Sequence, residues 1–180
     1  MLVLVGPSAS GKTQVVQLLI KNYGMKKMVT YTTRPKRVGE VEGIDYHFLT
    51  KEEFQKRILD NFFLEHVIYN GNFYGTSKSS ITDDKVVILE PVGLKHYIEL
   101  VRDKITIIYL KSDEKFLYDR MIRRHDTHEQ AMQRLALDKT VFTDELDNLV
   151  DYIIDSGDIS LQDLTQEVYD KYMQALKNHD

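Results

Sequence analysis

The chain has 180 residues and a formal net charge of −4, and 42% of its residues are apolar while 29% are charged. This composition is that of a single globular domain with a sizeable core, and it excludes a disordered chain. The lack of cysteine excludes disulfide bonds and thiolate metal sites, and no long basic run points to nucleic acid as a partner.

The N-terminal stretch combines a short apolar run with a helix pattern. Residues 1–5 are apolar and end at Gly6, which predicts a buried strand. Residues 12–22 carry apolar side chains at helical spacing, and Gly24 follows as a stop signal. The apolar run is too short for a signal peptide or a membrane span. We therefore expect a cytoplasmic protein without a membrane partner.

A polar segment rich in turns follows the first helix. It contains two runs typical of strands, at residues 44–49 and 64–69. Between them Thr50 is followed three residues later by Glu53, the spacing of a capping box, which predicts a short helix. Because this segment breaks the rhythm of the chain, we interpret residues 30–84 as an inserted subdomain.

The remainder of the chain alternates apolar runs with helix patterns. The predicted strands are 86–89, 105–110 and 152–154, and the predicted helices are 113–124, a helix that follows Thr127, and 161–176. Ser112 and Thr127 are the predicted N-caps, and Gln130 completes a capping box with Thr127. The alternation predicts an α/β fold of three layers with a mainly parallel central sheet. Its core comprises residues 1–29 and 85–180.

The sequence GPSASGKT at residues 6–13 matches the phosphate-loop motif G-x-x-x-x-G-K-[ST] at every specified position. Its glycines permit backbone angles that turn successive N–H groups toward a phosphate, and the following helix adds its positive dipole end. We expect Lys12 to reach the β- and γ-phosphates of ATP and the Thr13 hydroxyl to coordinate Mg²⁺. The expected ATP-binding residues are Gly6, Pro7, Ser8, Ala9, Ser10, Gly11, Lys12 and Thr13.

Two further strings closely resemble guanylate kinase, a phosphate-loop nucleoside-monophosphate kinase. Residues 30–48 read TYTTRPKRVGEVEGIDYHF, and residues 64–77 read LEHVIYNGNFYGTS. The resemblance is strong over residues 2–93 and weaker but collinear beyond them. It implies transfer of the γ-phosphoryl of Mg·ATP to GMP or dGMP, an inserted GMP-binding subdomain, and a mobile helical lid at about 120–140.

The first string carries candidate ligands for a phosphate. Arg34 and Arg37 lie three residues apart on a segment stiffened by Pro35. Guanidinium groups offer paired donors in a fixed fork, which suits a phosphate dianion, and Tyr46 and Tyr74 can each add a phenolic donor. The resemblance implies that these arginines and tyrosines hold the acceptor phosphate.

Guanine presents adjacent N1–H and N2–H₂ donors that a carboxylate can accept, while a hydroxyl can donate to O6. Glu65 matches the guanine-binding glutamate of the family, and Thr30 and Thr76 stand where the family usually has serine. At the family string D-x-D-x-x-G, Ile88 replaces the first aspartate and Glu90 the second. Glu90 remains a candidate GMP ligand, with its carboxylate about 1.5 Å farther out.

Arginines on the two helices that follow are candidate catalytic residues. Arg120 and Arg124 are four residues apart and share one helix face, and Arg134 follows on the next helix. Phosphoryl transfer needs positive charge around the migrating group. The resemblance implies that these lid arginines act together with Lys12.

Two alternatives remain open from the sequence. Thr30, Thr76 and Glu90 permit a sister kinase of the same fold that uses another phosphate acceptor. A non-catalytic guanylate-kinase-like module that binds phosphorylated peptides is the other, although such modules typically have an eroded phosphate loop. We expect nucleotides as partners, no nucleic acid, and a monomer or weak homodimer.

Overall fold

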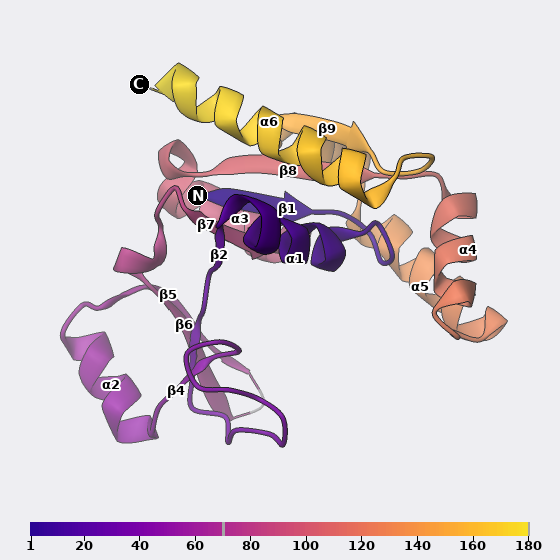
Figure 1. Ribbon diagram of the computed structural model, residues 1–180. Coiled ribbons are helices and arrows are strands. Elements are labelled where there is room, and N and C mark those ends of the chain that lie inside the picture. Colours follow the sequence, from indigo (N-terminus) through magenta and orange to yellow (C-terminus); the bar gives the residue numbers. More distant parts are fainter. Residues whose placement is uncertain (70, 180) are drawn as a thin grey trace. The chain divides into compact units, whose positions relative to one another are not determined.

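The computed structural model describes residues 1–69 and 71–179, and the chain divides into two compact units (Figure 1). The first unit comprises Met1–Lys26 and Val86–Asp180, and the second comprises Lys27–Lys85. The second unit is thus an insertion between two parts of the first. Within the described residues, no helix has both the length and the apolarity that crossing a bilayer requires.

A sheet with the strand order β2-β7-β1-β8-β9 forms the centre of the first unit. Its strands are β1 (Leu2–Val5), β2 (Lys26–Lys27), β7 (Lys85–Ile88), β8 (Thr106–Lys111) and β9 (Tyr152–Asp155). β1 pairs in parallel with β7 and β8, and β8 pairs in parallel with β9. Every residue of β1 is buried, as expected for a central parallel strand covered on both faces.

Helices α1 and α6 cover one face of this sheet (Figure 1). The helices of the unit are α1 (Lys12–Tyr23), α3 (Pro91–Val101), α4 (Glu114–Arg123), α5 (His128–Val141) and α6 (Leu161–His179), with the 3-10 turns η2 (Arg102–Lys104) and η3 (Asp144–Asn148). Leu19 of α1 and Val168 and Tyr172 of α6 are buried in one cluster with Leu4 and Ile108 of the strands. Burial of each such side chain stabilises the fold by roughly 1.5–3 kcal/mol.

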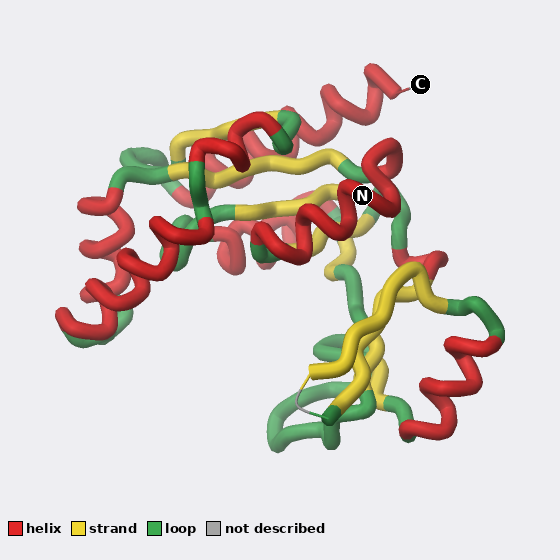
Figure 2. The backbone as a smooth tube through the Cα atoms, turned by 180° about the vertical axis from the view of Figure 1, so that it is seen from behind, coloured by secondary structure: helices red, strands yellow, loops and turns green. Residues whose placement is uncertain are grey.

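The opposite face of the sheet meets the end of α5. Ile107 and Tyr109 alternate along β8 with the residues that face α1 and α6, so they point to the other side. The Tyr109 ring stacks on that of Phe142, directly after α5, with 6.1 Å between centroids. Figure 2 gives the view from behind, with strands in yellow and helices in red. The contact ties the C-terminal end of α5 to the central sheet.

The second unit is a small mixed sheet with one helix. Its strand order is β4-β3-β6-β5, with β3 (Tyr31–Thr32), β4 (His47–Phe48), β5 (Phe63–Tyr69) and β6 (Asn72–Ser77), accompanied by α2 (Lys51–Leu59) and the 3-10 turn η1 (Lys78–Ser80). β3 runs parallel to β4 and antiparallel to β6, and β5 and β6 form an antiparallel pair. The α/β class with a separate mixed-sheet subdomain is therefore confirmed.

Aromatic side chains form the core of this unit. Phe54 of α2 is fully buried and stacks on Phe63 of β5 with 4.3 Å between ring centroids. Gly75 of β6 lies against both rings, because an added Cβ would come within 2.9 Å of Phe63 Cδ1 and 3.0 Å of Phe54 Cζ. Only glycine therefore fits at this position without displacing the aromatic pair.

The helix boundary signals of the sequence are largely confirmed. Thr50 and Thr127 each form a complete capping box. Gly24 ends α1 with φ at 68°, the left-handed conformation that favours glycine. The predicted N-cap Ser112 is wrong, because the chain stays extended through Asp113, whose φ and ψ are −65° and 146°, and α4 begins one residue later.

The strand predictions of the insertion are less accurate. The predicted strand at 44–49 is wrong over most of its length, since only His47–Phe48 pairs as β4 and Gly43, at φ 75°, turns the chain before it. β6 was not expected at all. Residue 70, within the string 64–77, lies outside the described residues. Pro91 begins α3, where its missing N–H is harmless.

Candidate nucleotide-binding sites

The phosphate loop connects β1 to α1. Ala9 has φ at 62° and Gly11 at 97°, so the backbone reverses its curvature there and forms a concave run of N–H groups. A left-handed alanine costs roughly 1–2 kcal/mol, and such strain concentrates at functional sites. A Cβ on Gly6 would lie 2.6 Å from the Leu110 carbonyl oxygen and 2.8 Å from Ser10 Oγ, so the first glycine of the motif is required by space.

Lys12 folds back over this loop. Its Nζ donates to the carbonyl oxygen of Gly6 at 2.5 Å and to that of Pro7 at 2.8 Å. Burial lowers the pKa of Lys12, and the negative charges of Glu90 and Asp138 partly offset this by raising it. A phosphate arriving at the loop favours the charged ammonium in the same way. The structure thus holds the lysine charge where the motif predicts that a phosphate binds.

Arg120 of α4 joins the phosphate loop to the chain that follows β9. Its Nη1 donates to the Ala9 carbonyl oxygen at 3.3 Å, and Nη2 donates to the carbonyl oxygens of Ser156 and, at 2.9 Å, Gly157. Burial, followed by the nearby charge of Arg124, lowers the pKa of Arg120. The guanidinium therefore links the backbone at the strained Ala9 to the backbone at Ser156 and Gly157 by hydrogen bonds.

A cavity of about 410 Å³ opens beside the loop and was not expected from the sequence. Its wall combines main chain and side chains from the phosphate loop, α1, α4, the 157–159 turn and the start of α6. The lining residues are Ser10, Gly11, Gln14, Phe116, Asp119, Arg120, Arg123, Gly157, Asp158, Ile159, Leu161 and Leu164. Its lining is mostly polar, with a few apolar side chains among the charged ones, which suits a small polar molecule.

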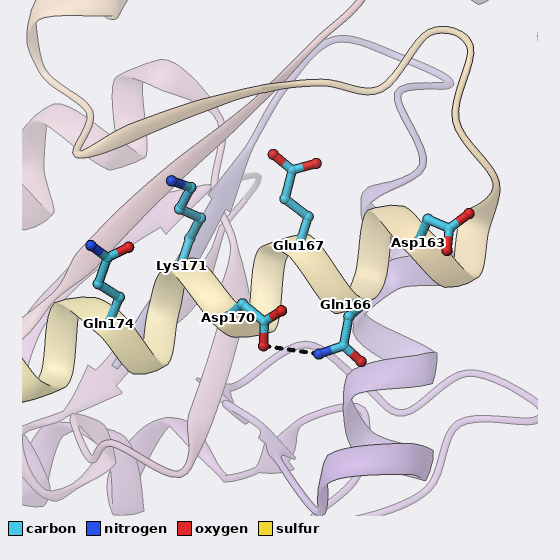
Figure 3. A pocket seen from close by; sticks show the side chains of 6 residues that line it. All are labelled: Asp163, Gln166, Glu167, Asp170, Lys171 and Gln174. Atoms are coloured by element: carbon cyan, nitrogen blue, oxygen red, sulfur yellow. Dashed lines mark hydrogen bonds between the residues drawn. The ribbon is translucent and has the colours of Figure 1, made fainter.

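A second hollow lies along α6, and Figure 3 shows its side chains. All of the residues that line its volume of about 310 Å³ come from this one helix, Asp163 through Gln174. Gln166 Nε2 donates to Asp170 Oδ1 at 2.9 Å, one helical turn away. Because no other element among residues 1–69 and 71–179 contributes a facing wall, we interpret this hollow as the solvated side of the helix.

The structure brings Arg124, but not Arg134, to the phosphate loop. Arg124 Nη2 donates to Gln14 Oε1 of α1 at 3.3 Å, so its charge lies close to the loop. Arg134 is exposed and pairs with Asp126, with 3.8 Å between Nη1 and Oδ2. The catalytic roles of the lid arginines stay predictions, and Arg134 is the one that needs a rearrangement to reach a phosphate.

Ile88 and Glu90 differ in environment at the end of β7. Ile88 is half-buried against the core cluster and lies opposite Leu4 of β1. Glu90 is exposed at the N-cap of α3, and its charge is felt by Lys12. Glu90 therefore belongs to the first unit, with the phosphate loop, whereas the other candidate GMP ligands all belong to the second unit.

The donor groups near the loop fit a magnesium ion that is shared with a bound phosphate. Thr13 is exposed in the first turn of α1, and Glu90 supplies an exposed carboxylate. Mg²⁺ is usually held by one or two protein oxygens together with substrate phosphates and water. Within residues 1–69 and 71–179, no cluster of three or more His, Cys, Asp or Glu side chains forms a self-sufficient metal cage.

In the second unit Arg34 is held by a carboxylate that sequence reasoning did not single out. Its Nη2 lies 2.6 Å from Glu40 Oε1, and both side chains are largely shielded, at 13% and 19% exposure. Glu40 Oε2 also accepts from the Arg37 main-chain N–H at 2.7 Å. The hydrogen bond to Glu40 raises the pKa of Arg34, and those from Arg34 and Arg37 lower the pKa of Glu40.

Two predicted tyrosines converge on Arg34. The guanidinium carbon lies 5.4 Å from the Tyr46 ring centroid, within the range of a cation–π contact. The Tyr74 hydroxyl adds to the raised pKa of Arg34, and the Tyr46 and Tyr74 rings meet edge to face at 6.2 Å. Arg37 is exposed on the same turn. The structure thus groups the predicted phosphate ligands Arg34, Tyr46 and Tyr74 and leaves Arg37 at their edge.

Glu65 and Thr76 meet on the β5–β6 pair. They lie opposite each other in the strand register, and Thr76 Oγ1 donates to Glu65 Oε1 at 2.8 Å. Thr76 is buried and Glu65 half-buried. Thr30 directly precedes β3, whose Tyr31 lies opposite Gly75, and it is half-buried. A carboxylate oriented by a buried hydroxyl is thereby presented at the surface of this unit.

Asp138 is a functional candidate that sequence reasoning missed. Its Oδ2 accepts from the Ser8 main-chain N–H at 2.8 Å across 130 residues of sequence. No local pattern reports such a contact. Glu40 could have been found, because it follows Arg34 by six residues within the same turn.

Comparison with known proteins connects these features to one family. The family model described as guanylate kinase matches residues 1–174. A guanylate kinase from Clostridium perfringens (strain SM101 / Type A) is 41% identical over 142 residues, covering 74% of this chain and 66% of that protein, just under two thirds of its length. One from Symbiobacterium thermophilum is 31% identical over 167 residues, covering 89% and 79% of the two chains.

Solved structures support the fold. The crystal structure of guanylate kinase from Anaplasma phagocytophilum superposes with a TM-score of 0.61 at 20% identity, covering 97% of this chain and 85% of that one. A gluconokinase from Sinorhizobium meliloti has a TM-score of 0.55 at 15% identity, covering 98% and 93%. Since the family model spans nearly the whole sequence and the phosphate loop has the geometry that its motif predicts, the chain belongs to the guanylate kinase family.

Proposed function

We propose that the protein transfers the γ-phosphoryl group of Mg·ATP to GMP or dGMP and yields ADP and GDP or dGDP. The observation that carries the proposal is the Glu65–Thr76 pair, at 2.8 Å, in a unit that also groups Arg34, Tyr46 and Tyr74. The family membership and the intact phosphate loop support the kinase activity.

On the donor side, the triphosphate binds the N–H groups of the phosphate loop and Lys12. The cavity of about 410 Å³ beside the loop is large enough for the adenine and ribose. Phe116 and Ile159 offer apolar contact to the base, and the rim carboxylates Asp119 and Asp158 suit its exocyclic amine. Arg120 acts here as a positioning residue, since its donors hold the main chain of both walls.

On the acceptor side, Arg34 and Arg37 bind the monophosphate, and Tyr46 and Tyr74 add hydroxyl donors. Glu65 accepts from N1–H and N2–H₂ of guanine. Thr76 already donates to one oxygen of Glu65, which fixes the carboxylate in one orientation. Thr30, half-buried directly before β3, contributes a further hydroxyl donor, and Glu90 lies in the other unit, next to Lys12.

The reaction needs no protein nucleophile. A phosphate oxygen of GMP attacks the γ-phosphorus of ATP in line, the bond to the bridging oxygen breaks, and ADP leaves with the electron pair. Lys12 and the lid arginines Arg120, Arg124 and Arg134 neutralise the charge on the migrating group. Thr13, with Glu90 as a nearby carboxylate, would hold Mg²⁺, which supplies further charge neutralisation between the phosphates.

Turnover with a panel of acceptors tests the proposal. The protein is mixed with Mg·ATP and, separately, GMP, dGMP, AMP, CMP or UMP, and ADP release is followed. We expect turnover with GMP and dGMP alone. Lys12→Ala is expected to lower kcat by at least roughly 10²–10³-fold, since a charge that stabilises the transition state is lost. Lys21→Ala, at the exposed far end of the same helix, is the control and retains activity.

The panel also decides between the alternatives. Turnover confined to another monophosphate would replace GMP by that acceptor, in keeping with an apolar Ile88 at a position where the family has aspartate. Binding of ATP without turnover on any acceptor would contradict the kinase proposal and favour a binding module. A cytoplasmic location and a monomer or weak homodimer stay predictions.

A further inference from the structure

A carboxylate from a distant helix contacts the phosphate loop. Asp138 lies in the last turn of α5 and is half-buried, and its Oδ2 accepts from the Ser8 N–H at 2.8 Å. Ser8 is the third residue of the loop, whose N–H groups serve an anionic ligand. A carboxylate oxygen on one of these donors has the charge and the hydrogen-bonding capacity of a phosphate oxygen.

The contact is anchored on both sides of Asp138. Leu135, one turn earlier on α5, is buried in a cluster with Ala9 of the loop and with Leu117 and Met121 of α4. Four residues after Asp138, the Phe142 N–H donates to its carbonyl oxygen at 2.8 Å. The Phe142 ring also stacks on Tyr109 of the central sheet. The position of the carboxylate is therefore set by the packing of α5 and is not a free surface rotamer.

A bound triphosphate and this contact exclude each other. A main-chain N–H has one hydrogen to donate, so Ser8 cannot serve Asp138 and a phosphate oxygen at full strength together. The two anions also repel each other at short range in a partly buried site. The negative charge of Asp138 also raises the pKa of Lys12, whose ammonium group donates to the carbonyl oxygens of the loop.

We propose that Asp138 is an internal anion that occupies the Ser8 N–H while the phosphate loop is empty and has to leave it when a nucleoside triphosphate binds. The inference rests on the proposed function and deepens it. Asp138 lowers the affinity for the triphosphate, and its departure couples α5, a lid helix, to the filling of the loop. The segment between Leu135 and Phe142 is the part of α5 that responds.

A purely structural role of the Asp138–Ser8 hydrogen bond predicts a different change in triphosphate affinity. If the hydrogen bond only shaped the loop, removing the charge of Asp138 would leave triphosphate affinity unchanged or weaken it. If the carboxylate competes with the ligand, removing its charge tightens binding. Asp138→Asn separates the two, because the amide keeps an acceptor oxygen for the Ser8 N–H and loses only the charge.

The test measures the dissociation constant of Mg·ATP by calorimetry, without acceptor, for the whole protein and two variants. We expect D138N to bind Mg·ATP roughly tenfold more tightly than wild type, which corresponds to about 1.4 kcal/mol. Glu129→Gln is the matched control, because it removes one carboxylate from the exposed first turn of the same helix. It is expected to leave the affinity within about twofold of wild type, because exposed distant charges are screened.

A crystal structure of the wild-type protein with a non-hydrolysable Mg·ATP analogue gives a second test that needs no variant. We expect Asp138 Oδ2 beyond hydrogen-bonding distance of the Ser8 nitrogen. An intact contact in that complex overturns the inference, as does unchanged or weaker binding by D138N. Wild-type protein that binds no Mg·ATP contradicts the proposed function itself, and the inference falls with it, so the two failures are distinguishable.

Discussion

In each of the two units, a carboxylate of the same chain already engages a group that is predicted to bind phosphate. In the second unit Glu40 holds Arg34 at 2.6 Å, and in the first unit Asp138 holds the Ser8 N–H at 2.8 Å. The first pair spans six residues and the second 130. Glu40 therefore shapes its own turn, whereas Asp138 links the loop to a distant helix.

Because Glu40 makes a local contact and Asp138 a contact between distant segments, we expect the two carboxylates to have opposite effects on ligand binding. Glu40 also accepts from the Arg37 N–H, so it closes the turn that carries both arginines. Nη2 of Arg34 donates to Glu40 and Nη1 donates to the Pro35 carbonyl oxygen at 3.0 Å, while the guanidinium carbon lies 5.4 Å from the Tyr46 ring centroid. Glu40 thus orients a predicted phosphate ligand and is expected to help acceptor binding, whereas Asp138 occupies a predicted phosphate position and is expected to oppose donor binding.

The largest effect is expected at Arg34. Arg34→Ala removes the guanidinium that the tyrosines surround and leaves the shielded Glu40 without its cation. Loss of this guanidinium removes a paired, charge-assisted contact to the monophosphate, so we expect kcat/KM for GMP to fall by roughly 10²–10³-fold. The KM for ATP is expected to stay near that of wild type. Lys36→Ala, an exposed cation on the same turn, is the control in the same steady-state assay.

The next effect concerns the choice of base. Glu65→Gln replaces one acceptor oxygen by a donor that faces the guanine N–H groups. An unsatisfied buried donor costs about 1–3 kcal/mol, so the ratio of kcat/KM for GMP over AMP is expected to fall by roughly 10- to 100-fold. Glu52→Gln, on the exposed first turn of α2, serves as the control. An unchanged ratio would show that Glu65 does not contact the base.

The aromatic core of the second unit offers a test of stability alone. Gly75→Ala would place a methyl group 2.9 Å from Phe63 Cδ1 and 3.0 Å from Phe54 Cζ. Overpacking of this kind costs about 1–3 kcal/mol, measurable as a lower midpoint in urea unfolding. Lys78→Ala, exposed directly after β6, is expected to leave the midpoint unchanged. A Gly75→Ala protein with wild-type stability would contradict the packing described for this unit.

The smallest effect is expected at Glu40. Glu40→Gln keeps an acceptor for the Arg37 N–H but loses the charge opposite Arg34, so we expect the KM for GMP to rise roughly three- to tenfold, the effect of weakening one charge-assisted hydrogen bond. Tighter GMP binding in this variant would mean that Glu40 competes with the ligand as Asp138 is proposed to do.

The same residue gives a pH dependence with a defined sign. The folded-state pKa of Glu40 lies below its ordinary value of 4.5, first because of the Arg34 hydrogen bond and then because of the Arg37 N–H. Its contribution to stability is therefore fully present above pH 4.5 and is lost as the pH falls through the lowered pKa. Acid unfolding curves of Glu40→Gln are expected to lack this component.

The sequence predicts the phosphate loop well because its chemistry is local. Eight consecutive residues, from the end of β1 into the first turn of α1, specify the loop, and Gly6 and Ala9 adopt the special geometry within them. The two capping boxes are equally local, since each depends on residues three positions apart. The family strings then identify Arg34, Tyr46 and Tyr74, which the structure groups together.

Features that depend on distant packing could not be predicted in this way. Asp138 reaches Ser8 only because α5 packs on the loop, and the cavity beside the loop is lined by residues from the loop, α1, α4, the 157–159 turn and α6. The strand predicted at 44–49 is wrong because Gly43 turns a chain whose composition alone resembles a strand. Ile88 fits the apolar pattern of its strand, but this pattern does not explain why isoleucine replaces the aspartate of the family.

The central claim is that this chain moves a phosphoryl group from ATP to a guanine nucleotide. The most direct test incubates the wild-type protein with Mg²⁺, GMP and ATP labelled in the γ-phosphate, and then separates the nucleotides. We predict that the label appears in GDP in amounts equal to the ADP formed. Label that stays in ATP, or that appears only as inorganic phosphate, would contradict the account.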